Sequence, residues 1–260
     1  MNLVFASGFL VPQSLLGINY FRGLQEHIVA AGRHAAIFPK VPPLGSCKER
    51  AEGLAKAIFA AYPTGQVHII AHSMGGLDSR TLIGGNLGGL ADPGRIMSLT
   101  TVATPHRGSP VADLLVGPRP DGLRRLVYDG ISQALSLLGI DTGALANLTT
   151  LQALNVPDTA RTHPGIRHRS YFASGRPGPL ATCLALALGH HYLQADRGQE
   201  NDGLVTLDSA QYGEFQQPFW RCDHADAVGH NLDTLDLGGF HFDHFAAFDA
   251  IINGLELSPA

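Results

Sequence analysis

The most constraining feature of this chain is an apolar run that ends abruptly at a serine set among small residues. The run 67–71 is rich in β-branched residues and leads through His72 to Ser73, which Met74 and two glycines follow. A stretch compatible with a helix, 77–83, comes next. This layout predicts a nucleophile elbow, in which a buried strand turns sharply into a helix and presents a serine at the apex. The hydroxyl would lie above a helix N-terminus, where developing negative charge is favoured.

A short pattern of this kind can arise by chance in a chain with 31 glycines. The segment 130–134 nearly matches it, but no apolar strand precedes that segment, and we interpret it as the interior of a helix. At Ser73 the strand, the small neighbours and the helix occur together. This context favours a nucleophilic serine at position 73.

Composition limits the classes of protein to consider. The chain has 260 residues, of which 45% are hydrophobic and 15% charged, enough apolar material for one large α/β domain or two small ones. The net charge of −4 gives no electrostatic case for a nucleic-acid partner, and no basic block suggests anionic membranes. No apolar stretch reaches the length of a membrane-spanning helix, so we expect no integral membrane segment.

The amino-terminal residues and the cysteines indicate which cellular compartment to expect. The first six residues lead directly into a strand and lack the features of a signal peptide. We therefore expect a cytoplasmic protein, or a secreted one whose leader has been removed. The three cysteines have no metal-ligand spacing, and their odd number argues against a full disulfide framework.

Strand-like and helical stretches alternate along the first hundred residues. Strands are expected at 3–6, 35–38, 67–71 and 96–103, and helices at 21–31, 48–62 and 77–83. Such alternation is typical of βαβ units with a mostly parallel sheet and right-handed crossovers. The predicted class is therefore α/β, with a central sheet flanked by helices. We predict a single domain over 1–260, because no repeat or low-complexity linker divides the chain.

The alternation breaks between residues 110 and 164. Helical stretches rich in Leu and Ala are expected there, at 111–116, 123–138 and 145–154, before strand character returns at 169–173. One interpretation is an insertion that lies over the carboxyl edge of the sheet as a lid or cap. The other is a set of ordinary core helices.

A serine hydroxyl needs a base and an orienting acid to become a good nucleophile. In α/β-hydrolases these follow the serine in the order acid, then histidine. Asp202 is the leading acid, because a turn rich in Asn, Asp and Gly before an apolar pair places a carboxylate on a tight loop. Asp196 and Asp208 are alternatives, and, taken alone, an Asx turn that merely caps the loop is the better explanation of Asp202.

The base must be chosen among 13 histidines. His224 follows a probable strand end, and the other histidines in the required order are His230, His241 and His244. His72 and His106 precede the acid and break that order. We expect His72, which flanks the serine, to pack nearby without accepting its proton.

Several longer strings resemble the bacterial true lipases, the secreted triacylglycerol lipases of the Pseudomonas and Burkholderia type. The similar strings are Ser7-Gly8-Phe9, 20–26, 76–80, 103–109, 148–150, 201–205, 212–213 and 224–226. In that family the aspartate of the Asn-Asp-Gly-Leu-Val string is the acid, and the histidine before a small–Asp step is the base. The resemblance implies an α/β-hydrolase fold, the triad Ser73, Asp202 and His224, and a lid within 110–164.

Two backbone N–H groups should bind the oxyanion. One belongs by position to the residue after the nucleophile, Met74, and the other to the loop after the first strand. The resemblance places the second at Phe9. The chain departs from the family in having Ser7 before Gly8, where a histidine is usual.

Family members hold a structural calcium between two aspartates. Asp226 matches one of them, but the other falls near Leu180, which cannot ligate a hard cation. We therefore expect no metal and no cofactor, with Asp226 paired by a salt bridge or hydrogen bond. The histidines at 224–244 suggest zinc only weakly.

These features together predict a serine carboxylic-ester hydrolase, a lipase or esterase that acts on lipophilic esters such as acylglycerols through an acyl-enzyme. The expected partner is a small-molecule or lipid ester, and the apolar insertion suggests either a hydrophobic acyl pocket or a lid that acts at a lipid–water interface. A polyester depolymerase, thioesterase or acyltransferase would use the same triad. A hydrolase-fold protein that only binds a ligand is disfavoured, because all three triad positions are filled.

Overall fold

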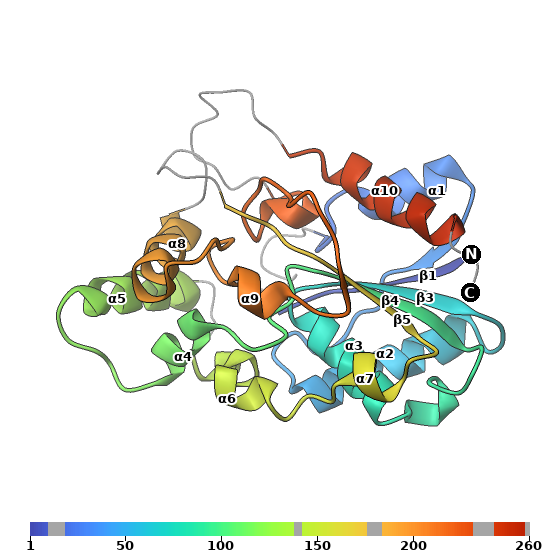
Figure 1. Cartoon of the computed structure of the whole chain (residues 1–260), viewed down its shortest axis with the longest axis horizontal. Coiled ribbons are helices and arrows are strands. Elements are labelled where there is room, and N and C mark those ends of the chain that lie inside the picture. Colours follow the sequence, from blue (N-terminus) through green and yellow to red (C-terminus); the bar gives the residue numbers. More distant parts are fainter. Residues whose placement is uncertain (10–18, 138–141, 176–183, 231–241, 258–260) are drawn as a thin grey trace.

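The computed structural model describes residues 1–9, 19–137, 142–175, 184–230 and 242–257 (Figure 1). Its centre is a six-stranded sheet in the order β2-β1-β3-β4-β5-β6, and every pairing between neighbouring strands is parallel. The strands are β1 (Asn2–Ala6), β2 (Ala35–Ile37), β3 (Val67–His72), β4 (Ile96–Val102), β5 (Arg167–Tyr171) and β6 (Glu214–Phe215). Their carboxyl ends therefore meet at one edge of the sheet, where ligands bind in open α/β sheets.

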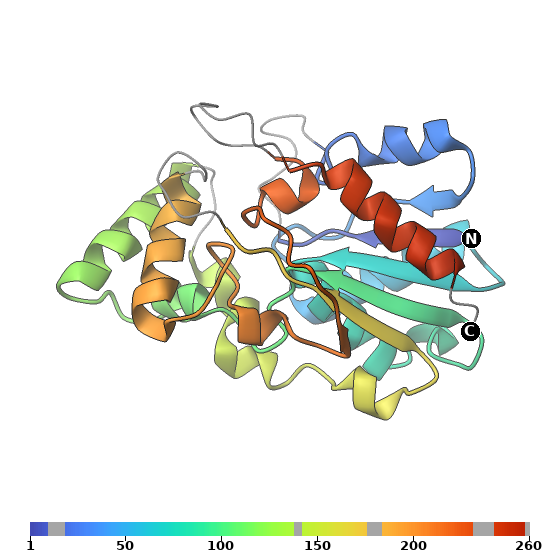
Figure 2. The same cartoon turned by 45° about the horizontal axis from the view of Figure 1, so that its top comes forward.

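Helices cover both faces of this sheet. α1 (Leu24–Ala31) and α10 (His244–Glu256) lie on one face, and α2 (Cys47–Ala61) and α3 (Met74–Gly84) lie on the other (Figure 2). The strand period of two sends alternate side chains to the two layers. In β1, Leu3 and Phe5 join the core beneath α1 and α10, whereas Val4 joins the core beneath α2.

The start of α2 shows how local sequence sets these elements. Ser46 accepts a hydrogen bond from the N–H of Glu49, whose side chain accepts one from the N–H of Ser46. This capping box satisfies two backbone donors that the first turn would otherwise leave unpaired.

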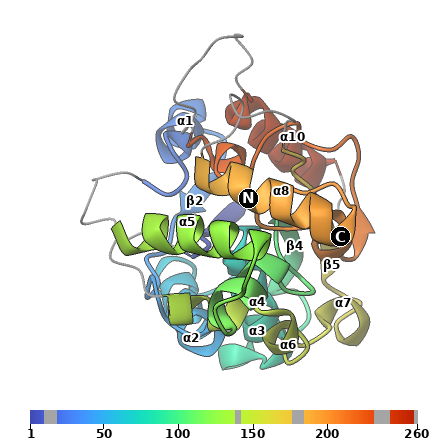
Figure 3. The same ribbon diagram turned by 90° about the vertical axis from the view of Figure 1, so that its left-hand side faces the viewer.

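A layer of helices lies beyond the carboxyl edge of the sheet, and we call it the cap layer (Figure 3). It consists of α4 (Pro110–Val116), α5 (Leu123–Leu137), the 3₁₀ helix η3 (Thr142–Leu148), α6 (Thr150–Ala153) and α8 (Leu184–Arg197). α8 packs on α5 and α4. Part of the cap layer therefore comes from outside the predicted insertion 110–164, and its action as a lid stays a prediction.

The remaining short helices complete the connections. They are α7 (Thr159–Thr162), α9 (Leu207–Ala210), η2 (Leu87–Gly89) and η4 (Asp226–Val228). α7 falls within 110–164 but packs beside α3, away from the cap layer. Within the described ranges, every helix is too short or too polar to span a bilayer.

Most predicted elements are present with ends shifted by a few residues, but one predicted helix was wrong and α8 was missed. The helix expected at 145–154 is instead η3 followed by α6, because Thr149 takes an extended conformation and caps α6 with its hydroxyl. α8 was not predicted at all. The helix expected at 21–31 begins only at Leu24, since Gly23 is left-handed, with φ 69°.

Candidate active site

The predicted sharp turn between β3 and α3 is confirmed, and Ser73 is its apex. Its backbone has φ 55° and ψ −132°, a strained conformation for a residue with a side chain. A Cβ atom added at Gly75 would lie 2.7 Å from the carbonyl oxygen of Ser7 and closer still to that of Ala6. One added at Gly76 would meet the side chain of Thr104. Both glycines are therefore required by how closely α3 approaches the ends of β1 and β4.

Hydrogen bonds hold this strained turn in place. The N–H of Ser73 donates to the carbonyl of Val102 at 3.0 Å and so continues the pairing of β3 with β4. The hydroxyl of Thr104 donates to the carbonyl of Ser73 at 2.8 Å. The apex is thus bonded on both sides of its Cα atom.

The structure brings Ser73, Asp202 and His224 together from three separate loops at the carboxyl edge. Nε2 of His224 lies 2.9 Å from Oγ of Ser73, and Nδ1 lies 2.7 Å from Oδ2 of Asp202. All three residues are buried. The N–H of His224 also donates to the carbonyl of Asp202 at 3.0 Å, so the two loops are joined through the backbone as well.

Asp202 has two functions in its loop, one with each carboxylate oxygen. Oδ1 accepts the N–H groups of Leu204 and Val205, at 2.9 and 2.7 Å, and closes an Asx-type turn. Oδ2 is left for His224. The turn-forming interpretation and the catalytic one are therefore both compatible with this residue, because the turn fixes the carboxylate that orients the imidazole.

The electrostatics of His224 suit a proton acceptor. Burial by itself lowers the pKa of the imidazole, but the charge of Asp202 and its hydrogen bond outweigh burial, so the net pKa of His224 is raised above its usual value. An imidazolium formed during proton transfer would therefore be stabilised by the neighbouring carboxylate.

The alternative acids lie elsewhere. Asp196 is on α8 and pairs with Arg124 of the cap layer, N···O 2.7 Å. Asp208 is exposed at the second position of α9 and accepts from the side chain of Gln199. Among the described residues, neither Asp196 nor Asp208 is bonded to a histidine. Of the three candidate acids, only Asp202 is placed to orient a histidine near Ser73.

The alternative bases also lie elsewhere. Nε2 of His230 bonds the carbonyl of Tyr20 at 2.7 Å, and Nε2 of His244 bonds that of Arg22 at 2.8 Å. His106 belongs to a separate buried network with Arg80 and Thr101. His241 lies outside the described residues.

His72 packs beside the site, as predicted. Its ring centroid lies 4.7 Å from that of His224, and its Nδ1 lies 2.6 Å from the hydroxyl of Tyr20. Burial holds the pKa of His72 well below its usual value, and the nearby His224 adds to this effect. His72 is therefore a neutral neighbour of the predicted base.

The two predicted oxyanion donors come from segments that meet at Ser73. Met74 begins α3 and is buried, and the side chain of Phe9 packs with Met74 and Leu77. A Cβ atom at Gly8 would lie only 2.6 Å from Cβ of Ser73. The segment 7–9, which we call the oxyanion loop, therefore passes directly against the serine, in keeping with the predicted donors.

Sequence reasoning missed Arg50, which lies on the buried face of α2. Its side chain is fully buried and donates to the carbonyls of Ser7 and Gly8, at 2.7 and 2.9 Å. Its Nε donates to Oδ2 of Asp78 at 2.8 Å. Arg50 thus fixes the oxyanion loop from behind. The available signal was an arginine adjoining the apolar positions 51, 54, 55 and 58 of a helix.

The predicted absence of a metal is not tested by this structure. Across the part of the chain that is described, no three His, Cys, Asp or Glu side chains gather as a metal-binding group. Asp226 begins η4, and its N–H donates to Oδ1 of the buried Asp223 at 2.8 Å. Leu180 lies outside the described residues.

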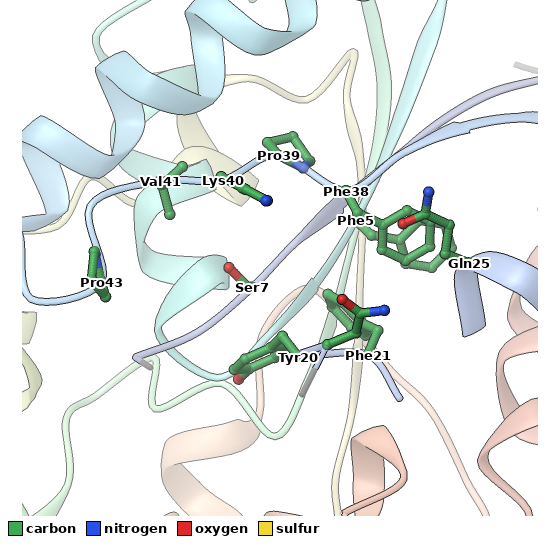
Figure 4. Close-up of a pocket in the computed structure, with 11 residues that line it drawn as sticks. Phe5, Ser7, Tyr20, Phe21, Gln25, Phe38, Pro39, Lys40, Val41 and Pro43 are labelled. Atoms are coloured by element: carbon green, nitrogen blue, oxygen red, sulfur yellow. The ribbon is translucent and has the colours of Figure 1, made fainter. Parts of the chain in front are cut away.

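A cavity of about 240 Å³ opens beside the oxyanion loop (Figure 4). Its walls are mostly apolar, and its polar lining includes Ser7, Tyr20 and Lys40. None of the three predicted triad residues lines it. The cavity therefore lies next to the place where an ester carbonyl would meet Ser73, and not at that place.

Comparison with known proteins agrees with this geometry. The chain is 32% identical over 223 residues to triacylglycerol lipase 2 of Saccharomyces cerevisiae, covering 83% of this chain and 64% of the yeast protein. It is 26% identical over 254 residues to a triacylglycerol lipase of Vibrio cholerae, covering 87% and 78%. The chain is therefore similar over most of its length to triacylglycerol lipases. No family model matches it.

The α/β-hydrolase fold of this chain is shared with solved structures. The crystal structure of Staphylococcus hyicus lipase superimposes with a TM-score of 0.67 at 21% identity, over 98% of this chain and 95% of that one. At this identity the likeness establishes the fold. The chain spans less than two thirds of the length of its yeast relative.

Proposed function

We propose that this chain is a serine carboxylic-ester hydrolase that acts on lipophilic esters such as acylglycerols. The observation that carries the proposal is the pair of contacts made by His224, 2.9 Å to Ser73 and 2.7 Å to Asp202. A hydroxyl, an imidazole and a carboxylate at hydrogen-bonding distance in this order form the arrangement that activates a serine. The strained elbow supports the same assignment.

In the proposed reaction, Oγ of Ser73 attacks the ester carbonyl while Nε2 of His224 takes the hydroxyl proton. Asp202 holds the proton of the neutral ring on Nδ1 and stabilises the imidazolium that forms. The N–H groups of Phe9 and Met74 bind the oxyanion of the tetrahedral intermediate. His224 then gives its proton to the leaving alcohol, and water releases the acyl group from Ser73 by the same steps in reverse.

Apolar surroundings support a lipophilic substrate. The side chain of Phe9 contacts both the cluster around Met74 and the apolar core of the cap layer, which includes Leu115 and Ile131. The approach to the oxyanion loop from the cap layer is therefore lined by hydrocarbon. The relatives from yeast and Vibrio are named as triacylglycerol lipases, which agrees with this substrate class.

We further propose that the cap layer contacts a lipid–water interface. Leucines on two of its helices are largely exposed: Leu126 on α5 at 66%, Leu151 on α6 at 70%. Leu154, directly after α6, is exposed at 80%. Exposed leucines of this kind are suited to insertion into an apolar phase.

The test of the chemistry is the Ser73→Ala variant, assayed on p-nitrophenyl butyrate. We expect no hydrolysis above background and no labelling by a fluorophosphonate, while the circular dichroism spectrum stays that of the wild type. Full activity in the folded variant would refute the proposal. A folded wild-type protein that is not labelled would instead favour a non-catalytic binding protein.

A substrate panel separates enzymes that share the same triad. Tributyrin, a long-chain triglyceride, a polyester film and an acyl-thioester would be compared at matched enzyme concentration. We expect the triglycerides to be hydrolysed fastest. A preference for the polyester or the thioester would identify the protein as a depolymerase or a thioesterase.

A further inference from the structure

The hydroxyl of Tyr20 lies where the oxyanion loop, the elbow and the ring of His72 come together. Its oxygen is 2.6 Å from Nδ1 of His72. A Cβ atom at Gly8 would lie 2.5 Å from this oxygen and 2.6 Å from Cβ of Ser73. The Tyr20 side chain also lines the cavity beside the oxyanion loop (Figure 4). The Tyr20 hydroxyl is therefore in contact with both the oxyanion loop, at Gly8, and the ring of His72.

The direction of the hydrogen bonds follows from the protonation states. Burial strongly raises the pKa of Tyr20, so the phenol keeps its proton. The phenol also packs directly against Gly8, where an added Cβ atom would lie 2.5 Å from its oxygen. The phenol proton is then free to be donated to Nδ1 of His72. A neutral His72 in this arrangement carries its own proton on Nε2.

His72 in turn touches the predicted base. The two rings are 4.7 Å apart between centroids, with an angle of 45° between their planes. Nε2 of His72 is buried, and the backbone of His224 lies beside it. The position of the His72 ring, set by Tyr20, therefore limits where the ring of His224 can lie.

The backbone of the same segment is tied to the loop that follows His224. The carbonyl of Tyr20 bonds Nε2 of His230 at 2.7 Å, and the N–H of Arg22 donates to the carbonyl of Val228 at 3.1 Å. The side chain of Tyr20 thus contacts the oxyanion loop and His72, while the main chain of residues 20–22 contacts the loop that follows His224.

We propose that Tyr20 is a positioning residue, whose hydroxyl, acting through Gly8 and His72, aligns the oxyanion loop and His224 with Ser73. This inference rests on the proposed ester hydrolysis. Small errors of alignment cost rate far more than they cost substrate binding. The hydroxyl of Tyr20 should therefore affect kcat and leave KM nearly unchanged.

The test removes this hydroxyl alone, as Tyr20→Phe, and measures kcat and KM on p-nitrophenyl butyrate. We expect kcat to fall about tenfold while KM changes by less than about twofold. Rates are expressed per active site titrated with a fluorophosphonate, so that misfolded protein does not count. The matched control is Tyr212→Phe, whose partly buried hydroxyl bonds Thr159 and Ala160, away from the triad. It should lower stability without changing kcat.

A double-mutant cycle tests whether Tyr20 acts through His72. If it does, Tyr20→Phe should reduce kcat little further in a His72→Ala background, because one hydrogen bond is lost in either case. His72→Asn keeps an acceptor close to the position of Nδ1 and should retain more activity than His72→Ala. Nitrogen-15 spectra of the wild-type imidazoles should show His72 neutral and protonated on Nε2.

The outcomes separate this inference from the proposed function. An inert, unlabelled wild-type protein would overturn both. An active wild type with unchanged kcat in Tyr20→Phe, or strictly additive effects in the cycle, would overturn the role of Tyr20 alone. If Tyr20→Phe fails to fold, the two His72 variants decide. An equal loss of kcat in His72→Ala and His72→Asn would overturn the role of Tyr20, and a higher kcat in His72→Asn would support it.

Discussion

The Nδ1 atom of His224 lies 2.7 Å from Oδ2 of Asp202, and both side chains are buried. Burial and the carboxylate act in opposite directions on the imidazole, and the carboxylate prevails, so the pKa of His224 is raised. The same contact keeps the proton of the neutral ring on Nδ1. Nε2 is then left unprotonated, facing Ser73 at 2.9 Å.

The first prediction concerns the pH dependence of kcat/KM. The base must be neutral to accept a proton, so activity should fall as pH decreases through the pKa of His224, which lies above the usual 6.5. Asp202→Asn removes the main cause that raises this pKa and leaves burial, which lowers it, opposed only by the weaker effect of Asp223. The acid limb should therefore move to lower pH, while kcat falls by about 10³- to 10⁴-fold. An acid limb that stays in place would contradict the assignment of His224.

The second prediction concerns the strain at Ser73. Glycine adopts φ 55° and ψ −132° with little cost, whereas alanine bears the same strain as serine. We expect Ser73→Gly to be more stable to urea than Ser73→Ala by about 1 kcal/mol, although neither hydrolyses esters. Equal midpoints in the two variants would mean that the turn relaxes when the hydroxyl is removed.

The third prediction concerns the close approach of α3 to β1. Gly75→Ala places a methyl group 2.7 Å from the carbonyl oxygen of Ser7, and main-chain atoms cannot easily move away. We expect a loss of about 3 kcal/mol in the free energy of unfolding. The matched control is Gly165→Ala, because a Cβ atom there meets nothing within 4 Å and its change should stay within about 0.5 kcal/mol.

The fourth prediction concerns the buried ion pair beneath the oxyanion loop. Arg50→Met leaves Asp78 buried without its cation and should cost about 3 to 5 kcal/mol of stability. Part of this loss should be recovered by adding Asp78→Asn. The control is Arg167→Met, which breaks a largely exposed pair with Glu214 and should cost less than about 1 kcal/mol in the same denaturation experiment.

The fifth prediction concerns the exposed leucines of the cap layer. Leu126→Ser combined with Leu151→Ser should slow hydrolysis of an emulsified long-chain triglyceride about fivefold or more, because each buried leucine contributes about 1.5 to 3 kcal/mol. Hydrolysis of soluble p-nitrophenyl butyrate should be unchanged. Leu257→Ser alters a leucine that is exposed at 84% and follows α10, a helix far from the cap layer (Figure 1), and it should affect neither rate.

Regular sequence patterns allowed the strands and helices of the first hundred residues to be predicted. The continuous apolar run 3–6 of β1 predicts a strand covered on both faces, and the structure has helices on both faces of the sheet. The elbow was predicted because its requirements are local: a strand, a serine and small residues within ten positions. Gly75 and Gly76 meet those requirements through contacts that any larger side chain would break.

The cap layer was predicted less well. Its helices pack on one another in one apolar cluster, and periodicity alone did not separate η3 from α6 or reveal α8. Their boundaries depend on single caps such as Thr149. Such caps give a weak signal in a stretch already rich in Leu and Ala.

The sequence by itself determined the parallel sheet, the position of the elbow and the candidates for the acid and base. Only the tertiary structure decided which of them meet, because Ser73 and His224 are 151 positions apart and their contact depends on the packing of several loops at one edge of the sheet. The same holds for Arg50 and Tyr20. Their polar groups reach the oxyanion loop through contacts that no local pattern records.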